Sequence, residues 1–201
     1  MTQLPDDNRA FANLLDQKEL VICVGSGGVG KTTSSAVIGL NAALAGRKVL
    51  VLTIDPAKRL ANSLGVSALD NEAQQIPLAQ FRDIGLEPEG QLWAMMLDMK
   101  ESFDALVHRH APSEQNRQDI LDNRFYQYFS TSLAGTQEYA ASERLYELHK
   151  ERDFDLIVLD TPPTTHALDF LEAPQRLARA VDNKALQWLY KPNVLTGTSG
   201  L

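Results

Sequence analysis

The sequence predicts a doubly wound α/β fold built on a mostly parallel sheet. Three observations support this prediction: two short apolar runs flank a helix-compatible stretch, a glycine-rich loop joins the first run to that stretch, and two more apolar runs follow downstream. Short, continuous apolar runs are typical of strands that are buried on both faces of a parallel sheet. A strand, a helix and a second strand in this order form a βαβ unit with a right-handed crossover.

The first βαβ unit lies near the N-terminus. Residues 20–24 are predicted as its first strand, and a glycine-rich loop follows at 25–33. A helix rich in alanine and leucine is expected over 33–45, because Gly46 stands where a glycine often follows the end of a helix. Residues 49–54 are the predicted second strand of the unit.

Two further strands are predicted after a weakly patterned region. Residues 71–90 are mostly polar and contain two prolines, which predicts loops and short elements. The apolar runs at 92–97 and 154–159 are the predicted third and last strands.

Helices are expected around the last strand. Residues 99–150 are predicted to be a helical insertion, broken near Pro112 and near Gly135. Further helical segments are expected over 167–190, and no strand is predicted after them. Residues 1–201 are therefore interpreted as a single domain that is truncated at its C-terminus, because doubly wound sheets of this type carry further strands.

Composition excludes several classes of protein. Lysine and arginine total 19 and aspartate and glutamate total 26, giving a net charge of −7. An acidic chain is not expected to bind nucleic acid, because affinity for the phosphate backbone requires a basic surface. No apolar run reaches the ~18 residues of a membrane span, the N-terminus does not resemble a signal peptide, and a cytoplasmic location is expected. The single cysteine, Cys23, excludes an internal disulfide and a metal site made only of thiols.

The glycine-rich loop matches a phosphate-binding pattern. Residues 25–32 fit G-x-x-x-x-G-K-[ST], which places backbone N–H groups around phosphate oxygens at the N-terminus of a helix. Lys31 is then expected to reach the β- and γ-phosphates and Thr32 to ligate Mg²⁺. The strand before the loop and the helix after it favour a nucleotide-binding P-loop over a glycine-rich turn without a ligand. The residues predicted to contact the nucleotide are Gly27, Gly28, Val29, Gly30, Lys31, Thr32 and Thr33.

A rival class uses the same glycines. Three of them also fit the dinucleotide pattern G-x-G-x-x-G, and Asp55 follows the second strand where a ribose-binding acid would stand, as in an NAD-dependent oxidoreductase. Lys31 and Thr32 directly after the last glycine favour the P-loop instead. So does Asp160, a second acid at the end of a strand.

Two acids that follow strands are the candidates for the chemistry. Asp160 closes the last predicted strand, where it is expected to hold a Mg²⁺-bound water near Thr32; the alternative is a helix cap or turn residue. Asp55 is expected to orient or deprotonate the attacking water, and the alternative is a turn residue before Pro56. Lys31 and Asp55 are therefore the predicted catalytic residues.

Three other polar residues follow these acids. Lys58 and Arg59 suit phosphate contacts and a solvated loop equally well, and this choice stays open. His166 is not predicted to bind a metal, because the sequence offers it no second ligand.

Together these motifs resemble those of the ArsA family, P-loop NTPases of the deviant Walker A class. That family includes the arsenite-pump ATPase and the ATPase that targets tail-anchored proteins. Residues 25–33 resemble its P-loop, 55–57 its switch I and 160–166 its switch II. Residues 135–139 and 161–174 are most similar to a bacterial branch whose cargo is poorly defined.

The resemblance implies a dimeric, Mg²⁺-dependent ATPase that binds ATP at the subunit interface. By matching positions, Lys31 and Thr32 would bind phosphate and Mg²⁺, Asp55 would position the water, and Asp160 would sense the γ-phosphate through Mg²⁺. ATP binding and hydrolysis would order and release the switch loops and move the partner subunit. The expected partner is a second copy or a paralogous subunit, with a protein or membrane complex as a further partner.

The sequence departs from the family pattern at two points. Ser26 stands where the family has a signature lysine that reaches across the dimer, so Arg59 or a lysine-bearing subunit is expected to supply the cation. Loss of such a cation costs on the order of 10³-fold in rate. Cys23 alone supports neither a three-thiol arsenite site nor an interfacial zinc site.

Two alternative functions remain for a P-loop protein of this kind. One is a nucleotide-sensing module that holds ATP and barely hydrolyses it, which Ser26 makes plausible. The other is a partitioning ATPase of the Min or Par type.

Overall fold

Five strands of the described part of the chain form one sheet at the centre of the protein. The structure, a computed structural model, describes residues 15–55, 58–83, 85–132, 136–151 and 153–163. The strands run in the order β1-β5-β2-β4-β3 across the sheet. Their bounds are β1 Leu20–Cys23, β2 Lys48–Thr53, β3 Gln74–Gln75, β4 Gln91–Met96 and β5 Leu156–Asp160. All of the pairings are parallel except that of β3 with β4, which is antiparallel.

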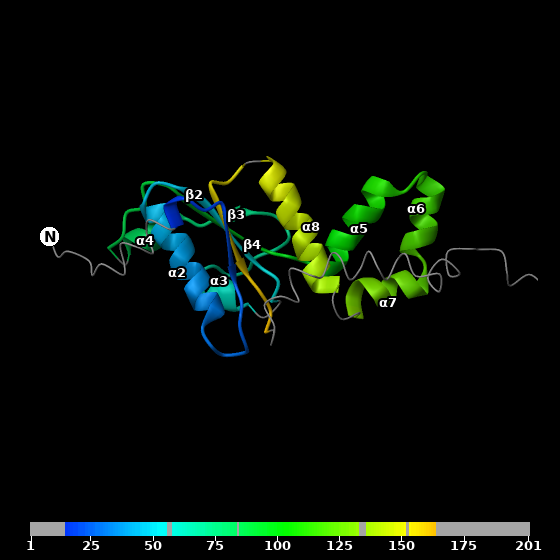
Figure 1. Cartoon of the computed structure of the whole chain (residues 1–201), viewed down its shortest axis with the longest axis horizontal. Coiled ribbons are helices and arrows are strands. Elements are labelled where there is room, and N and C mark those ends of the chain that lie inside the picture. The colour runs from blue at the N-terminus through cyan, green and yellow to red at the C-terminus, as the bar shows by residue number, and fades with distance from the viewer. Residues whose placement is uncertain (1–14, 56–57, 84, 133–135, 152, 164–201) are drawn as a thin grey trace, which may run out of the picture.

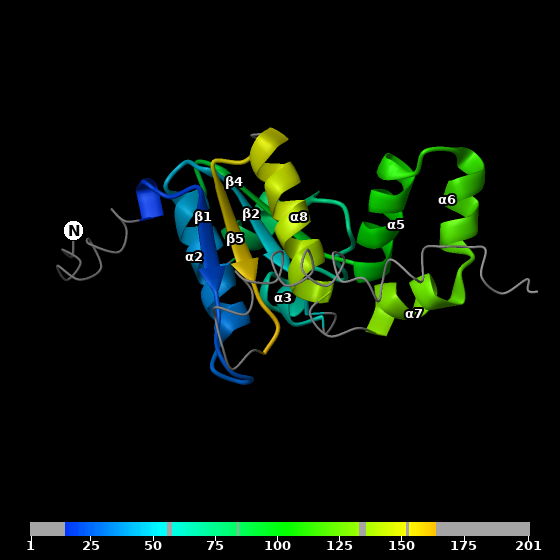
Figure 2. The ribbon, with the colours of Figure 1, turned by 45° about the vertical axis from the view of Figure 1, so that its right-hand side comes forward.

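Helices connect the strands and cover both faces of the sheet (Figures 1 and 2). Their bounds are α2 Lys31–Leu44, α3 Arg59–Ser63, α4 Leu78–Arg82, α5 Met99–His110, α6 Glu114–Leu121, α7 Arg124–Ser132 and α8 Thr136–Glu151. Residues 164–201, which include His166 and the helices predicted over 167–190, lie outside the described residues.

Alternate residues of the central strands build two separate cores. In β2, Val49 and Val51 pack with residues of α2 and α3 on one face, while Leu50 and Leu52 pack with residues of α5 and α8 on the other. All four side chains are fully buried. This explains why β2 is continuously apolar, because neither face meets water. The predicted doubly wound, mostly parallel α/β fold is confirmed.

The helical segment between β4 and β5 consists of four described helices rather than the three that its two predicted breaks imply. The break near Pro112 is present, since α5 ends at His110 and α6 starts at Glu114 after the cap Ser113. The further break before α7 was not predicted. There the side chain of Asn123 accepts a hydrogen bond of 3.4 Å from the N–H of Tyr126, as in a helix N-cap, without any glycine or proline to signal it. Gly135 lies outside the described residues.

The polar region at 71–90 contains the short elements that were expected and one strand that was not. β3 is two glutamines long and pairs with β4 at the edge of the sheet. Such a short polar strand has no hydrophobic period to reveal it. Among the described residues, no helix is long and apolar enough to cross a lipid bilayer.

The parallel pairing brings three strand ends together. β5 lies between β1 and β2, and in this register Asp160 is beside Cys23 on one side and Thr53 on the other. The carboxyl ends of these strands, and the loops that leave them, therefore meet at one edge of the sheet. In open α/β sheets this edge is where ligands bind.

Candidate functional site

The loop from β1 to α2 has the backbone conformation of an anion-binding turn. Gly28 and Gly30 have φ angles of 78° and 92°, a left-handed conformation that glycine adopts without strain. Helix α2 begins directly after Gly30, and none of the described side chains caps its N-terminus. Its first backbone N–H groups are therefore available to an anion, which the partial positive charge of a helix N-terminus also favours.

Lys31 is the cation of this loop. Its Nζ donates a hydrogen bond of 2.9 Å to the backbone oxygen of Ser26, so the side chain curls back over the loop. Residues 26–30 are exposed, which leaves the loop open to a ligand from solvent. The predicted contact residues Gly27 to Thr33 thus lie in one loop and the first turn of one helix.

Asp160 is the centre of a hydrogen-bonded cluster under the loop. Its Oδ2 accepts a hydrogen bond of 2.7 Å from the hydroxyl of Thr32 and one of 3.1 Å from the hydroxyl of Thr53. The Thr53 oxygen in turn accepts a hydrogen bond of 3.2 Å from the N–H of Asp55. The predicted metal ligands, Thr32 and Asp160, are therefore in direct contact, and Thr53 joins them to the loop that carries Asp55.

The electrostatics of Asp160 are those of a buried carboxyl group. Only 1% of the residue is exposed, and its Oδ1 has no hydrogen-bond partner among the described residues. Burial raises the pKa of Asp160 above its usual range, and the charge of Asp55 adds to this effect. The hydrogen bonds from Thr32 and Thr53 and the charge of Lys31 act in the opposite direction. An orphaned, buried carboxylate oxygen beside a hydroxyl fits a hard cation such as Mg²⁺, which prefers oxygen ligands.

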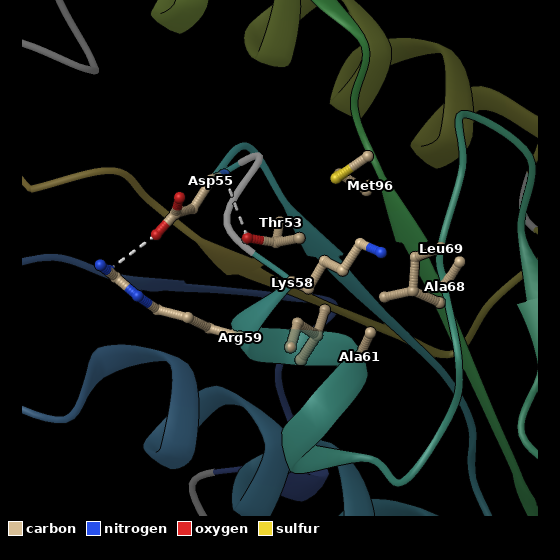
Figure 3. Close-up of a pocket in the computed structure, with 9 residues that line it drawn as sticks. Thr53, Asp55, Lys58, Arg59, Ala61, Ala68, Leu69 and Met96 are labelled. Carbon is tan, nitrogen blue, oxygen red and sulfur yellow. Dashed lines mark hydrogen bonds and ion pairs between the residues drawn. The ribbon is translucent and has the colours of Figure 1, made fainter.

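Asp55 lies in the loop after β2 and pairs with the first residue of α3. Its Oδ2 is 2.8 Å from Nη1 of Arg59 (Figure 3). The side chain of Asp55 is 15% exposed and that of Arg59 is 61% exposed. Figure 3 also shows that Lys58 extends the opposite way, toward Leu69 and Met96. Of the two neighbouring cations, only Arg59 is therefore directed at the acid.

The cavity shown in Figure 3 is not large enough for a nucleotide. It measures about 70 Å³ and lies behind the Asp55 loop, between α3, β4 and the segment at 68–69. Sites for organic ligands of drug size occupy roughly 300–1,000 Å³. The candidate phosphate site is therefore the exposed loop before α2 rather than this cavity.

The segment after β5 lies on the P-loop. Thr161 donates a hydrogen bond of 2.8 Å from its hydroxyl to the backbone oxygen of Cys23, at the end of β1. Pro163 lies beside Gly27, where an added Cβ would be 3.8 Å from the ring. This distance is an ordinary van der Waals contact, so the segment after β5 lies close against the loop without excluding a small side chain at position 27.

Sequence reasoning missed one member of this cluster and left another open. Thr53 was not singled out, although a hydroxyl at the last position of a strand, two residues before a candidate catalytic acid, is a usable signal. The pairing of Arg59 with Asp55 could not be read from their separation of four residues, because Asp55 lies in the loop before α3 and not on the helix. Among the described residues, no three His, Cys, Asp or Glu side chains group as a metal cluster.

Comparison with known proteins identifies similar chains. The ArsA_ATPase family model, described as anion-transporting ATPase, matches residues 18–193. The protein named ATPase GET3 from Malassezia globosa is 30% identical over 171 residues, which are 84% of this chain and 47% of that protein. ATPase get3 from Schizosaccharomyces japonicus is 31% identical over 171 residues, which are 84% of this chain and 48% of that protein. The chain thus spans about half the length of these relatives.

Among solved structures, the kinase domain of Escherichia coli tyrosine kinase ETK is similar at 17% identity with a TM-score of 0.38. The match covers 87% of this chain and 68% of that domain. A likeness this weak supports no conclusion about the site.

Proposed function

The chain belongs to the ArsA family of anion-transporting ATPases, and on that premise we propose that it binds ATP with Mg²⁺ and hydrolyses ATP to ADP and phosphate. The observation that carries the proposal is the hydrogen bond between Thr32 and Asp160, with the orphaned Oδ1 of Asp160 buried beside it. This contact joins the phosphate loop to the end of a neighbouring strand, as a Mg²⁺-nucleotide site requires.

The loop at 25–30 and the first turn of α2 would bind the phosphates. The N–H groups of residues 27–33 would bind the β- and γ-phosphate oxygens, and Lys31 would leave the Ser26 carbonyl for them. Thr32 and Asp160 would hold Mg²⁺, the first through its hydroxyl oxygen and the second through its carboxylate. When bound, the cation supplies neutralisation of phosphate charge.

The bond-breaking step requires a positioned water. The water oxygen attacks the γ-phosphorus, the bond from this phosphorus to the β,γ-bridging oxygen breaks, and ADP and inorganic phosphate are formed. Asp55 would accept a hydrogen bond from the water and so fix its direction of attack. Support for this role comes from its position, since the charge of Asp55 acts on the buried Asp160.

Coupling of hydrolysis to motion would use the loops that leave β2 and β5. The hydrogen bonds from Asp55 to Thr53 and from Thr53 to Asp160 link both loops to one carboxylate. Loss of the γ-phosphate would change the contacts of this carboxylate and release both loops together. The two loops would then act on a partner subunit, either a second copy of this chain or a paralogue, and so move or target a cargo.

A nucleotide-dependent switch with slow turnover is the second candidate. Ser26 supports it, because the loop at 25–33 then carries a single cation, Lys31. A P-loop without a second cation would bind ATP but hydrolyse it slowly, because less of the charge on the γ-phosphate is neutralised.

The proposal is tested by Mg²⁺-dependent ATP turnover of the full-length protein over a range of protein concentrations. We expect specific activity that rises with concentration, since the proposed dimer completes the site. Asp83→Asn, an exposed carboxyl group at the end of α4, is the matched control for Asp55→Asn. Tight ATP binding with negligible turnover at every concentration would favour the slow switch, and failure to bind ATP would contradict both candidates.

A further inference from the structure

The charges around the phosphate loop do not suit a polyanion by themselves. Lys31 contributes one positive charge, whereas Asp55 and Asp160 contribute two negative charges when ionised, and both Lys31 and Asp55 act on Asp160. The three groups alone are net negative, so these side chains attract a phosphate chain only together with the proposed Mg²⁺ or a further cation. Arg59, paired with Asp55 at 2.8 Å, brings the set to neutrality.

The guanidinium group of Arg59 can move while the backbone of Arg59 stays in place. The next two residues of α3, Leu60 and Ala61, are 2% and 3% exposed and belong to the core that α2 and β2 share. The Arg59 side chain is 61% exposed. Because Leu60 and Ala61 hold the helix in the core while the guanidinium group is exposed, Arg59 can exchange one ion-pair partner for another without a change of fold.

The ion pair is weak enough to exchange. An ion pair with one largely exposed partner contributes little to stability, because water and salt screen it. A terminal phosphate has more negative charge than a carboxylate, and its oxygens match the fork of an arginine in the same way. A γ-phosphate bound beside Asp55 is therefore the stronger partner.

We propose, resting on the function proposed above, that Arg59 is the second phosphate-binding cation of this site. It pairs with Asp55 when no nucleotide is bound and moves to the γ-phosphate of bound ATP. Two effects follow from one movement: the guanidinium neutralises charge that develops on the γ-phosphoryl oxygens, and the Asp55 oxygen that it leaves can receive the attacking water. ADP has no γ-phosphate, so Arg59 returns to Asp55 after phosphate is released.

The neighbouring Lys58 provides the matched control. It differs from Arg59 by one position and has the same charge, but its side chain extends toward Leu69 and Met96 rather than toward Asp55 (Figure 3). Lys58→Ala thus removes one positive charge from the same loop without removing the exchange partner.

The test compares Arg59→Ala, Arg59→Lys and Lys58→Ala in the full-length protein. Three quantities are measured: the rate constant for hydrolysis of saturating Mg²⁺-ATP, the Kd for ADP, and the Kd for a non-hydrolysable ATP analogue. For Arg59→Ala we expect a rate lower by about 10³-fold, which is the lower end for an arginine directed at the γ-phosphate. Binding of the analogue should weaken by about tenfold, while binding of ADP changes by less than about threefold.

Two further results are expected if the guanidinium itself acts. Arg59→Lys should recover part of the lost rate, and free guanidinium ion added to Arg59→Ala should accelerate it without accelerating the wild type. Lys58→Ala should stay within about threefold of the wild type, as surface substitutions outside a site do.

Several outcomes would overturn the proposal. Wild-type or faster turnover in Arg59→Ala would show that the ion pair only restrains Asp55. If Arg59→Ala weakened the binding of ADP and of the ATP analogue equally, Arg59 would instead support the fold of the loop. A wild-type protein that binds ADP and the analogue but does not hydrolyse ATP would contradict the proposed ATPase function alone, since the difference in affinity between the analogue and ADP still tests Arg59. A wild type that binds neither nucleotide contradicts both proposals.

Discussion

Thr32 and Asp160 are 128 positions apart in the sequence, yet the Thr32 hydroxyl donates a 2.7 Å hydrogen bond to the Asp160 carboxylate. The contact exists because β5 is inserted between β1 and β2, which places Asp160 beneath the loop that starts α2. It is the point where the phosphate loop and the end of the last described strand are joined.

Removal of the Thr32 hydroxyl should weaken Mg²⁺ binding. Thr32→Val keeps the shape of the side chain but leaves the cation without one ligand and Asp160 without one donor. We expect the Mg²⁺ concentration for half-maximal ATP binding to rise by about 10- to 100-fold. Thr32→Ser, which retains the hydroxyl, is the control and should stay within about threefold of the wild type. Equal Mg²⁺ dependence in Thr32→Val and Thr32→Ser would contradict the assignment.

Asp160→Asn should stabilise the nucleotide-free protein at neutral pH. Burial raises the pKa of Asp160, so the folded protein binds its proton more tightly than the unfolded chain does. The ionised carboxylate therefore costs stability at pH 7, and a neutral amide costs less to bury. We expect an increase of about 1 kcal/mol in the free energy of unfolding, or about 2–4 °C in Tm.

The pH dependence of the stability gained by Asp160→Asn shows whether burial of a charge is its cause. The stability that protonated Asp160 contributes is present below the ordinary aspartate pKa of 3.8 and is lost as pH rises through the raised pKa of the folded state. The advantage of Asp160→Asn should therefore shrink as the pH is lowered from 7 toward 3.8. Thermal melts at several pH values measure it, with Asp83→Asn as the exposed control. A gain that does not vary with pH would show that charge burial is not its source.

Gly39→Ala should destabilise the protein although alanine favours helices. A Cβ at position 39 would lie 2.5 Å from Val51 Cγ2 and 3.2 Å from Leu92 Cδ1, on the core side of α2. The overpacking cost, about 1–3 kcal/mol, exceeds the helix-propensity gain of about 1 kcal/mol. Asn41→Ala, on the exposed side of the same helix, should leave stability within about 0.5 kcal/mol. Chemical denaturation measures both, and a more stable Gly39→Ala would contradict the close packing of α2 on β2.

The sequence was sufficient for the elements that have a strong local signal. Continuous apolar runs predicted β1, β2, β4 and β5. Most residues of β2 and β5 and half of those in β4 are buried, whereas β1 is an edge strand whose residues are only partly buried or exposed. Gly46 ends α2 as expected, with a φ of 92° just after the cap Ala45. The helix after the P-loop begins at Lys31 rather than at residue 33 as predicted, so Lys31 and Thr32 lie in the first turn of α2 and not in the loop.

What the sequence did not reveal depends on contacts between distant segments. The insertion of β5 between β1 and β2 is a matter of strand order, and only this order makes Thr53 a donor to Asp160. The β3 strand is too short and too polar to show a period. The direction of Arg59 toward Asp55, and of Lys58 away from it, depends on the exact start of α3 and cannot be read from two adjacent cations.

Single-turnover hydrolysis shows whether this chain is a Mg²⁺-dependent ATPase in which Asp55 positions the attacking water. Full-length wild type, Asp55→Asn and Asp83→Asn are each mixed in excess over Mg²⁺-ATP, and ADP is followed with time. This role of Asp55 predicts complete conversion by the wild type and by Asp83→Asn, and a rate lower by about 10²- to 10⁴-fold in Asp55→Asn with unchanged ATP affinity. Equal rates in all three proteins, or no conversion by a wild type that binds ATP, would contradict it.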